Sequence, residues 1–270
     1  MSEQDLRATF DAVASQYADV RPGYPDELFD ELVAVTGIGP DSELLEIGPG
    51  TGQATVPLAA RGFAITAVEL GGAMARLARK NLAAYPRAHV VQAPVEDADL
   101  PLHAFDLVYA ATSLHWVPEA VRSRRPHDLL RQGGHLAAIY SEHVSDESGD
   151  AFFLASQEIY RTATEQPHPR ADAHGGSPDD EPRLPRVSDL RPEHLDPDLF
   201  EPVGFRVFPI VIRYSAERFA GLVDTFSTTR ALPPQARAER LVGLRRLIDH
   251  DFGGHLDLRF AMTLTVARAR

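Results

Sequence analysis

Short apolar runs alternate with amphipathic segments over the first half of the chain. A run such as AITAVE at residues 64–69 has the length and composition of a buried strand, and the segments between the runs have helical spacing. Buried strands that alternate with helices predict a parallel, doubly wound α/β sheet, which binds its ligand at the carboxyl ends of its strands. The predicted strands are 43–47, 64–69, 89–92, 105–110 and 135–140, and the predicted helices are 6–20, 26–36, 51–61, 73–84 and 118–130.

The pattern changes after residue 141. An acidic and polar stretch is followed by a predicted helix, and then by a segment rich in proline, aspartate and glycine that predicts a long loop. Strand and helix patterns then return, and Pro209 restricts the first returning strand to a sheet edge or a bulge. The predicted helices are 151–164, 216–227 and 234–252, the loop is 166–191, and the strands are 204–214 and 256–267.

The first strand leads into a turn that contains three alternate glycines. The sequence LLEIGPGTGQ carries an acid, Glu46, before Gly48, Gly50 and Gly52. Glycines at a strand-to-helix turn allow a nucleotide-like ligand to approach the backbone closely. A dinucleotide fingerprint would need its third glycine at Gln53, and the Glu46 carboxylate would repel a diphosphate but attract a cation.

This turn resembles motif I, E/D-x-G-x-G-x-G, of the class I S-adenosylmethionine (SAM) dependent methyltransferases. In that family the acid and the glycine turn hold the methionine end of SAM, which carries an ammonium and a sulfonium but no phosphate. Glu69 ends the second strand, where a carboxylate can accept hydrogen bonds from both ribose hydroxyls in either SAM or NAD. Leu70 is expected beside the adenine. The resemblance further implies that Val95 and Glu96, after the third strand, lie at the adenine edge.

The fourth strand runs into the sequence ATSLHWV at residues 111–117. The end of a central strand forms the mouth of the pocket in such a sheet, so Ala111 is expected to contact the cofactor. His115 can titrate near neutrality and is the candidate general base for the methyl acceptor. The alternative is that His115 only lines the pocket and Trp116 is a packing residue, because placement alone can supply much of the rate of methyl transfer.

Tyr17 and Arg21 belong to a segment, Y-x-x-x-R-P-x-Y-P, that resembles the lid of one subgroup, the trans-aconitate methyltransferase-like proteins with a methyltransferase type 11 domain. SLHWV at 113–117 and several segments after residue 213 resemble the same subgroup. The resemblance implies a seven-stranded, mostly parallel, Rossmann-like sheet whose last strand is antiparallel. It also implies that Tyr17 and Arg21 approach the methionine end, where Arg21 pairs with a carboxylate of SAM or substrate.

We therefore expect one methyltransferase domain made of four segments. Residues 142–203 match nothing specific in the subgroup, so they should select the substrate, and the acid substrates of the subgroup do not carry over. The segments are an N-terminal helical lid (1–36), a SAM-binding core (37–141), a substrate-cap insertion (142–203), and C-terminal strands and helices that complete the sheet (204–270).

Composition narrows the function classes. The chain has 27 Lys and Arg against 39 Asp and Glu, a formal charge of −12, which argues against nucleic acid as the main partner. It has no cysteine, and its histidines lack metal-ligand spacing, so no metal is expected. No apolar run reaches the ~20 residues of a membrane span, and no signal-peptide pattern is present, so we expect a cytoplasmic monomer or homodimer.

The sequence thus predicts SAM-dependent methyl transfer to oxygen or nitrogen, with carbon as a further option, of a small-molecule acceptor. An NAD-dependent oxidoreductase is one alternative, although Gln53 stands where a glycine is wanted. A SAM-binding protein without turnover is another. Methylation of RNA or protein is disfavoured by the acidic balance and by the expected cap.

Overall fold

A seven-stranded mixed sheet forms the centre of the fold in this computed structural model, which describes residues 20–164 and 183–270, without the side chains of residues 162–164. The strand order is β3-β2-β1-β4-β5-β7-β6. Strands β1 to β5 are parallel, and β7 is antiparallel to both neighbours, which confirms the predicted fold class. The strands are β1 (Glu43–Ile47), β2 (Ala64–Glu69), β3 (Ala88–Gln92), β4 (Phe105–Ala111), β5 (Leu130–His143), β6 (Phe200–Ser215) and β7 (His255–Ala269).

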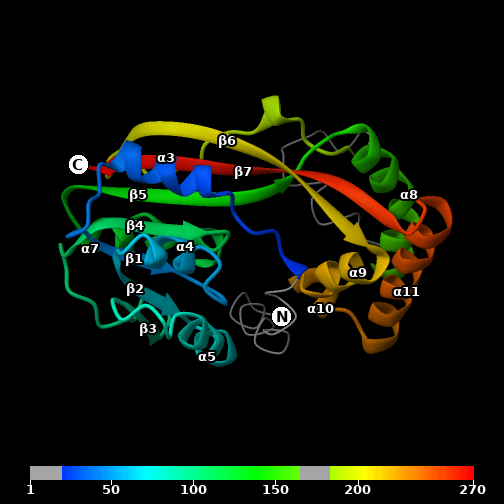
Figure 1. The fold of residues 1–270 in the computed structure, drawn as a ribbon, viewed down its shortest axis with the longest axis horizontal. Coiled ribbons are helices and arrows are strands. Elements are labelled where there is room, and N and C mark those ends of the chain that lie inside the picture. Colours follow the sequence, from blue (N-terminus) through cyan, green and yellow to red (C-terminus); the bar gives the residue numbers. More distant parts are fainter. Residues whose placement is uncertain (1–19, 165–182) are drawn as a thin grey trace.

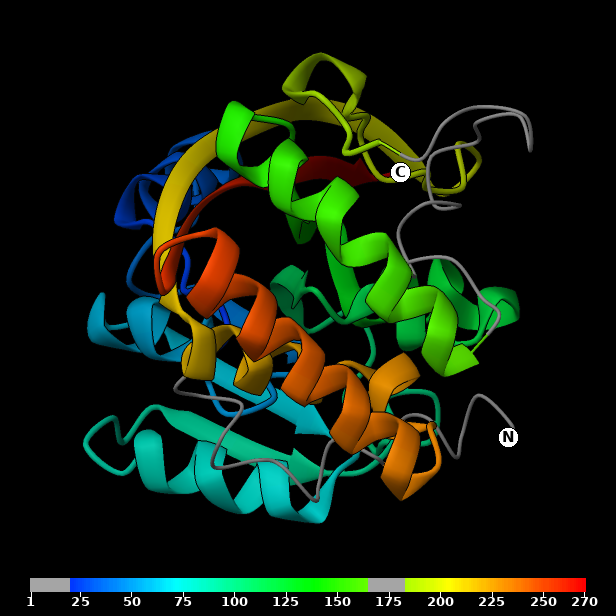
Figure 2. The same ribbon diagram turned by 90° about the vertical axis from the view of Figure 1, so that its right-hand side faces the viewer.

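The helices divide between the faces of the sheet and one of its ends. In Figure 1, β5, β6 and β7 reach beyond the shorter strands, and the parallel strands point toward a group of helices that includes α8, α9 and α11. Figure 2 shows α8 and α11 side by side at that end. The helices are α3 (Asp26–Thr36), α4 (Thr55–Ala60), α5 (Gly72–Asn81), α6 (Glu119–Arg122), α7 (Arg124–Leu129), α8 (Glu147–Thr164), α9 (Ala216–Asp224), α10 (Ser227–Arg230) and α11 (Pro234–Asp251), with short 3-10 turns η2 (Leu114–Trp116) and η3 (Val187–Asp189).

The central strands are buried on both faces because successive residues enter opposite cores. Leu44 and Leu107 belong to one hydrophobic cluster, whereas Leu45 and Val108, the next residues along β1 and β4, belong to the other. All four are fully buried. This is the expected state of a parallel sheet covered by helices on both sides. Because the sheet is covered on both faces, a ligand can reach the central strands at their ends.

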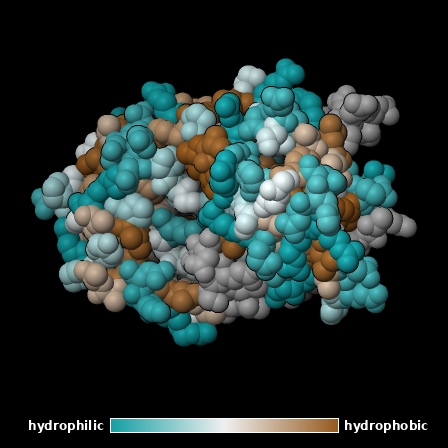
Figure 3. Space-filling view, turned by 45° about the vertical axis from the view of Figure 1, so that its right-hand side comes forward, coloured by the Kyte–Doolittle hydropathy of each residue, from teal (hydrophilic) through white to brown (hydrophobic). Residues whose placement is uncertain are grey.

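The face of the molecule in Figure 3 is mainly hydrophilic. On the face in Figure 3, hydrophobic side chains are scattered in small groups among hydrophilic ones. None of the helices that the structure describes combines the length and the hydropathy that crossing a bilayer requires.

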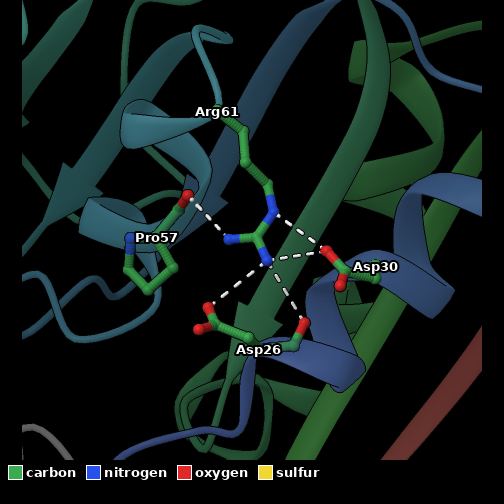
Figure 4. Close-up of polar contacts among 4 residues, drawn as sticks. All are labelled: Asp26, Asp30, Pro57 and Arg61. Carbon is green, nitrogen blue, oxygen red and sulfur yellow. Dashed lines mark hydrogen bonds and ion pairs between the residues drawn. The ribbon is translucent and has the colours of Figure 1, made fainter.

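A polar cluster around Arg61 fastens α3 to α4 (Figure 4). The guanidinium donates to Asp30 Oδ1 at 2.7 Å and to the carbonyl of Pro57 at 3.0 Å, and it also bonds Asp26. It lies 5.5 Å above the ring centroid of Phe29. Hydrogen bonds to Asp30 raise the pKa of Arg61, so the group stays charged. The cluster holds α3, the last helix of the segment predicted to be the lid, against α4, the helix that follows the glycine turn.

Most predicted elements are found, with differences at their ends. The predicted helix 51–61 begins only at Thr55, because residues 51–54 continue the glycine turn. The predicted helix 118–130 is broken into α6 and α7, since Pro126 has no N–H to donate to the preceding turn. Strand β6 lies at the sheet edge, as Pro209 requires. The predicted helix 6–20 falls, except for Val20, outside the described residues.

Strands β5 and β6 overlap the two ends of the predicted cap, 142–203. Strand β5 continues to His143, where it still pairs with β7, and β6 begins at Phe200. The residues between β5 and β6 are therefore 144–199, and α8 begins at Glu147, within the acidic and polar stretch that precedes the predicted helix 151–164. Of the predicted loop 166–191, the structure describes only 183–191, which contains η3. The division into lid, core, cap and completing segment stays a prediction.

Candidate functional site

A pocket of about 960 Å³, partly open to solvent, lies at the carboxyl ends of β1, β2 and β4. The pocket brings together Glu46, Gly48, Gly50, Glu69, Leu70, Val95, Glu96 and Ala111, all predicted from the sequence to contact the cofactor. The described lining also includes residues that the sequence analysis did not assign to the cofactor: Tyr24, Ile47, Pro49, Gln53, Ala54, Val68, Gly71, Met74, Ala93, Pro94, Thr112, Ser113, Trp116 and Val117.

The glycine turn is pinned at its first glycine. Gly48 has φ +66°, a conformation that side chains rarely adopt. The Ser113 hydroxyl donates to the carbonyl of Ile47, so β1 and the residue after β4 lie close together. A Cβ added at Gly48 would stand 2.7 Å from the Ser113 Cβ. Gly48 is thus required by its backbone conformation and by this contact. Gly52 belongs to the same turn but does not line the pocket.

Glu69 joins the glycine turn to the end of β2. One carboxylate oxygen accepts the backbone N–H of Gly50 at 2.9 Å, and the other accepts that of Gly71 at 2.8 Å. Each carboxylate oxygen has a second lone pair, so Glu69 can accept further bonds from a ligand in the pocket. Glu69 therefore organises the turn as well as lining the pocket, a role that strand patterns alone did not reveal.

Glu46 is fully buried at the end of β1. Its carboxylate accepts a hydrogen bond from the Tyr109 hydroxyl at 2.8 Å. Burial raises the pKa of Glu46 to about 7; the Thr55 and Tyr109 hydroxyls lower it, and the charge of Glu69 raises it further. Tyr109 was not predicted to have a role, but it is the register partner of Glu46 on β4, so strand pairing explains the contact.

The charged side chains among the described lining of the pocket are all acidic. Glu46, Glu69 and Glu96 face it, and its described lining contains no lysine, arginine or histidine. Carboxylates in a partly buried site stabilise a cation and repel a phosphate, because the low local dielectric strengthens both interactions. The pocket is therefore suited to a cationic ligand and unsuited to a dinucleotide.

Arg125 of α7 holds the loop after β3 by hydrogen bonds to its backbone. Its guanidinium donates to the carbonyl of Val95 at 3.0 Å and to that of Ala98 at 2.6 Å. Val95 is buried and lines the pocket. Sequence reasoning missed Arg125, because an arginine that bonds backbone carbonyls leaves no motif.

A second pocket, of about 670 Å³, adjoins the first. The two share Tyr24, Gln53 and Thr112, and the Tyr24 and Thr112 hydroxyls are hydrogen-bonded at 3.0 Å. Arg21 lies in this second pocket and not in the first. The other described lining residues are Pro22, Ser141, His143, Tyr160, Phe219, Leu222, Phe226, Leu258 and Phe260.

His115 lies beside the first pocket. It is not among the described residues that line either of the two pockets. Its ring centroid is 4.9 Å from that of Trp116, which does line the pocket, and 5.9 Å from that of Tyr140. Desolvation, followed by the charges of Arg122 and Arg21, lowers the pKa of His115 to about 4. The residue itself is exposed to solvent. Its role as a base stays a prediction. Tyr17 lies outside the described residues.

Comparison with known proteins finds a methyltransferase domain in this chain. Residues 45–138 match the family model of the methyltransferase domain. The chain is 29% identical over 140 residues, 52% of its length and 55% of the relative's, to an uncharacterised methyltransferase of Mycobacterium tuberculosis. It is 36% identical over 122 residues, 44% of its length and 46% of the relative's, to trans-aconitate 2-methyltransferase of an Enterobacter species. The chain spans about half the length of these curated relatives.

The fold is also found among solved structures. A structure described as a putative type II methyltransferase from Anaeromyxobacter dehalogenans superposes with a TM-score of 0.60 at 22% identity, covering 93% of this chain and 97% of that one. The matched domain, the strand order and the glycine turn agree with one another. Residues 45–138 are therefore similar to the methyltransferase domain family, and the whole chain shares the fold of a solved methyltransferase structure.

Proposed function

We propose that this chain transfers the methyl group of SAM to oxygen or nitrogen, or alternatively carbon, of a small-molecule acceptor. The observation that carries the proposal is the pairing of two adjoining pockets of different character. The first offers three carboxylates and no basic side chain among its described residues, and the second contains Arg21 and no carboxylate among its described residues. A cationic donor would therefore bind in the first pocket, and a neutral or anionic acceptor would bind in the second.

The first pocket fits the chemical groups of SAM. Glu46 would accept the ammonium, Glu69 the ribose hydroxyls, and the loop at Val95 and Glu96 the adenine edge, with Leu70 against the ring. The bound cofactor supplies a methyl group already activated by its sulfonium. The absence of basic side chains from the described lining disfavours NAD, whose diphosphate would meet three acids.

The second pocket would hold the acceptor so that its lone pair faces the methyl carbon across the residues shared by the two pockets. In such a transfer a bond would form from the acceptor atom to the methyl carbon as the carbon–sulfur bond breaks, and the acceptor would release any proton that it carried. Tyr24 and Thr112, bonded to each other, would exclude water at this junction and orient the acceptor. We keep His115 as the candidate base for that proton, through the pocket edge formed by Trp116.

The identity of the acceptor is left open by the relatives. The similarity to a trans-aconitate 2-methyltransferase supports a small-molecule acceptor, but it covers 44% of this chain. Much of the second pocket is built by residues after 140, including Phe219 and Phe260. The side chains that line the second pocket are therefore a better guide to the acceptor than the substrates of the relatives.

Titration calorimetry with SAM, S-adenosylhomocysteine and NADH tests the donor assignment. We expect SAM and S-adenosylhomocysteine to bind and NADH not to bind. Glu69→Ala should weaken SAM binding by tenfold or more, since hydrogen bonds to a charged group are worth about 1.5–3 kcal/mol each. Glu43→Gln, an exposed acid at the other end of β1, is the matched control and should bind normally.

Methyl transfer itself needs a second measurement. Protein with radiolabelled SAM and a metabolite extract should produce a labelled small molecule. Binding of NADH without SAM would refute the cofactor assignment. Binding of SAM with no labelled product from any extract would favour a binding protein over an enzyme.

A further inference from the structure

We propose that the second pocket takes an acceptor with a flat, largely apolar body and a single anionic group, rather than a polycarboxylate. The proposal rests on the proposed function, because it identifies the pocket as the acceptor site. It is argued from the shape of the lining, from its charge and from the way its one arginine is held.

The body of the pocket is apolar and rich in aromatic rings. Its apolar lining comprises Pro22, Phe219, Leu222, Phe226, Leu258 and Phe260. Phe219 comes from α9 and Phe260 from β7, so two walls far apart in the sequence each contribute a ring. Aromatic walls favour flat ligands, which stack on ring faces or edges, and they cannot replace the hydration of a charged group.

The charge of the pocket is provided by Arg21. Its Nε donates to the Thr225 hydroxyl at 3.0 Å, and Nη2 lies 3.4 Å from the Thr225 carbonyl. The guanidinium is also 4.8 Å from the ring centroid of Phe226. These contacts orient the group before any ligand arrives, which lowers the entropy lost on binding an anion.

One oriented guanidinium matches one carboxylate. The described lining holds no lysine or second arginine, and its other basic side chain, His143, has its ring centroid 5.3 Å from that of Phe260. A tricarboxylate would bring two further charges into a lining that offers them no lysine or second arginine among its described residues, only apolar side chains and the uncharged polar groups of Tyr24, Gln53, Thr112, Ser141 and Tyr160. Burying a charge without a partner costs more than the first ion pair returns, so such a ligand is excluded by the same pocket that accepts a monoanion.

Three probes that differ in one property each can test this on the full-length protein saturated with S-adenosylhomocysteine. Benzoate has the flat body and one anionic group, benzyl alcohol has the body without the charge, and propane-1,2,3-tricarboxylate has the charge without the body. By calorimetry we expect benzoate to bind at least about tenfold more tightly than either of the other two, the factor typical of one hydrogen bond to a charged group.

Variants assign the binding to the named side chains. Arg21→Gln should weaken benzoate about tenfold and leave benzyl alcohol unchanged, whereas Phe219→Leu should weaken both. Arg213→Gln is the matched control, because Arg213 is exposed, pairs with Asp257 and lines neither pocket. Circular dichroism of each variant confirms folding. Phe226→Leu replaces Phe219→Leu if the latter does not fold.

The outcomes separate this inference from the proposed function. If S-adenosylhomocysteine does not bind, the proposed function fails. If it binds but the tricarboxylate outcompetes benzoate, or benzoate does not bind, or Arg21→Gln leaves benzoate affinity unchanged, only the acceptor class is overturned.

Discussion

The buried acid at the end of β1 should destabilise the folded protein at neutral pH, and Glu46→Gln should relieve this. Glu46 is fully buried, and its carboxylate accepts a hydrogen bond from a neutral hydroxyl, that of Tyr109. Glutamine has nearly the same shape and can still accept the Tyr109 bond through its amide oxygen. The substitution therefore removes the ionisation with little change in packing.

The magnitude follows from the raised pKa. The pKa of Glu46 is 4.5 in an unfolded chain and about 7 when folded, and the difference is worth about 3 kcal/mol. Below pH 4.5 both states hold the proton, so the acid has no effect on stability. As pH rises from 4.5 to 7, the unfolded chain has released a proton that the folded chain keeps. The free energy of unfolding therefore falls across this window and stays reduced above it.

Urea denaturation at pH 5, 6, 7 and 8 measures this dependence. Glu46→Gln should differ little from the wild type at pH 5 and be more stable by up to about 3 kcal/mol at pH 8, at unchanged m value. Glu43→Gln, the same change at an exposed site, should show no such trend. A difference between Glu46→Gln and wild type that is the same at every pH would refute the reasoning. We also expect the variant to lose SAM affinity, a gain in stability at the expense of the site.

The remaining predictions concern the glycine turn, the loop after β3 and the candidate base. Gly48→Ala should lower the free energy of unfolding by about 1–2 kcal/mol for its backbone conformation and by a further ~1–3 kcal/mol for its contact with Ser113, measured by urea titration. Arg125→Ala should weaken S-adenosylhomocysteine binding by about tenfold in calorimetry, because the carbonyls of the loop lose their donor. His115→Ala should lower turnover and leave SAM affinity unchanged; because the pKa of His115 is lowered, the loss should be the same from pH 6 to 8.

Matched controls distinguish these effects from general damage. Gly37→Ala has the same conformation, with φ +67°, but no atom within 4 Å of the added Cβ, so it should cost only the backbone part. An equal loss at Gly37 and Gly48 would disprove the contact. Arg124→Ala, an exposed neighbour of Arg125, should bind normally. Unchanged turnover in His115→Ala would show that the residue is only part of the surroundings of the pocket.

The sequence by itself determined the sheet, the glycine turn and the acidic character of the cofactor pocket. These features depend on local patterns: apolar runs make the strands, glycines make the turn, and an acid at a strand end must lie at the carboxyl edge of a parallel sheet. Glu46 and Glu69 could therefore be placed from their positions in β1 and β2 alone.

Only the tertiary structure decided which partners those residues have and what the second pocket contains. Burial raises the pKa of Glu46, and Glu69 joins the glycine turn to the end of β2 through the backbone N–H groups of Gly50 and Gly71. Arg21 meets Phe226, 205 positions later in the chain, because α9 and α10 fold back over the strand ends. Contacts between such distant segments arise from packing and leave no periodicity or spacing in the sequence.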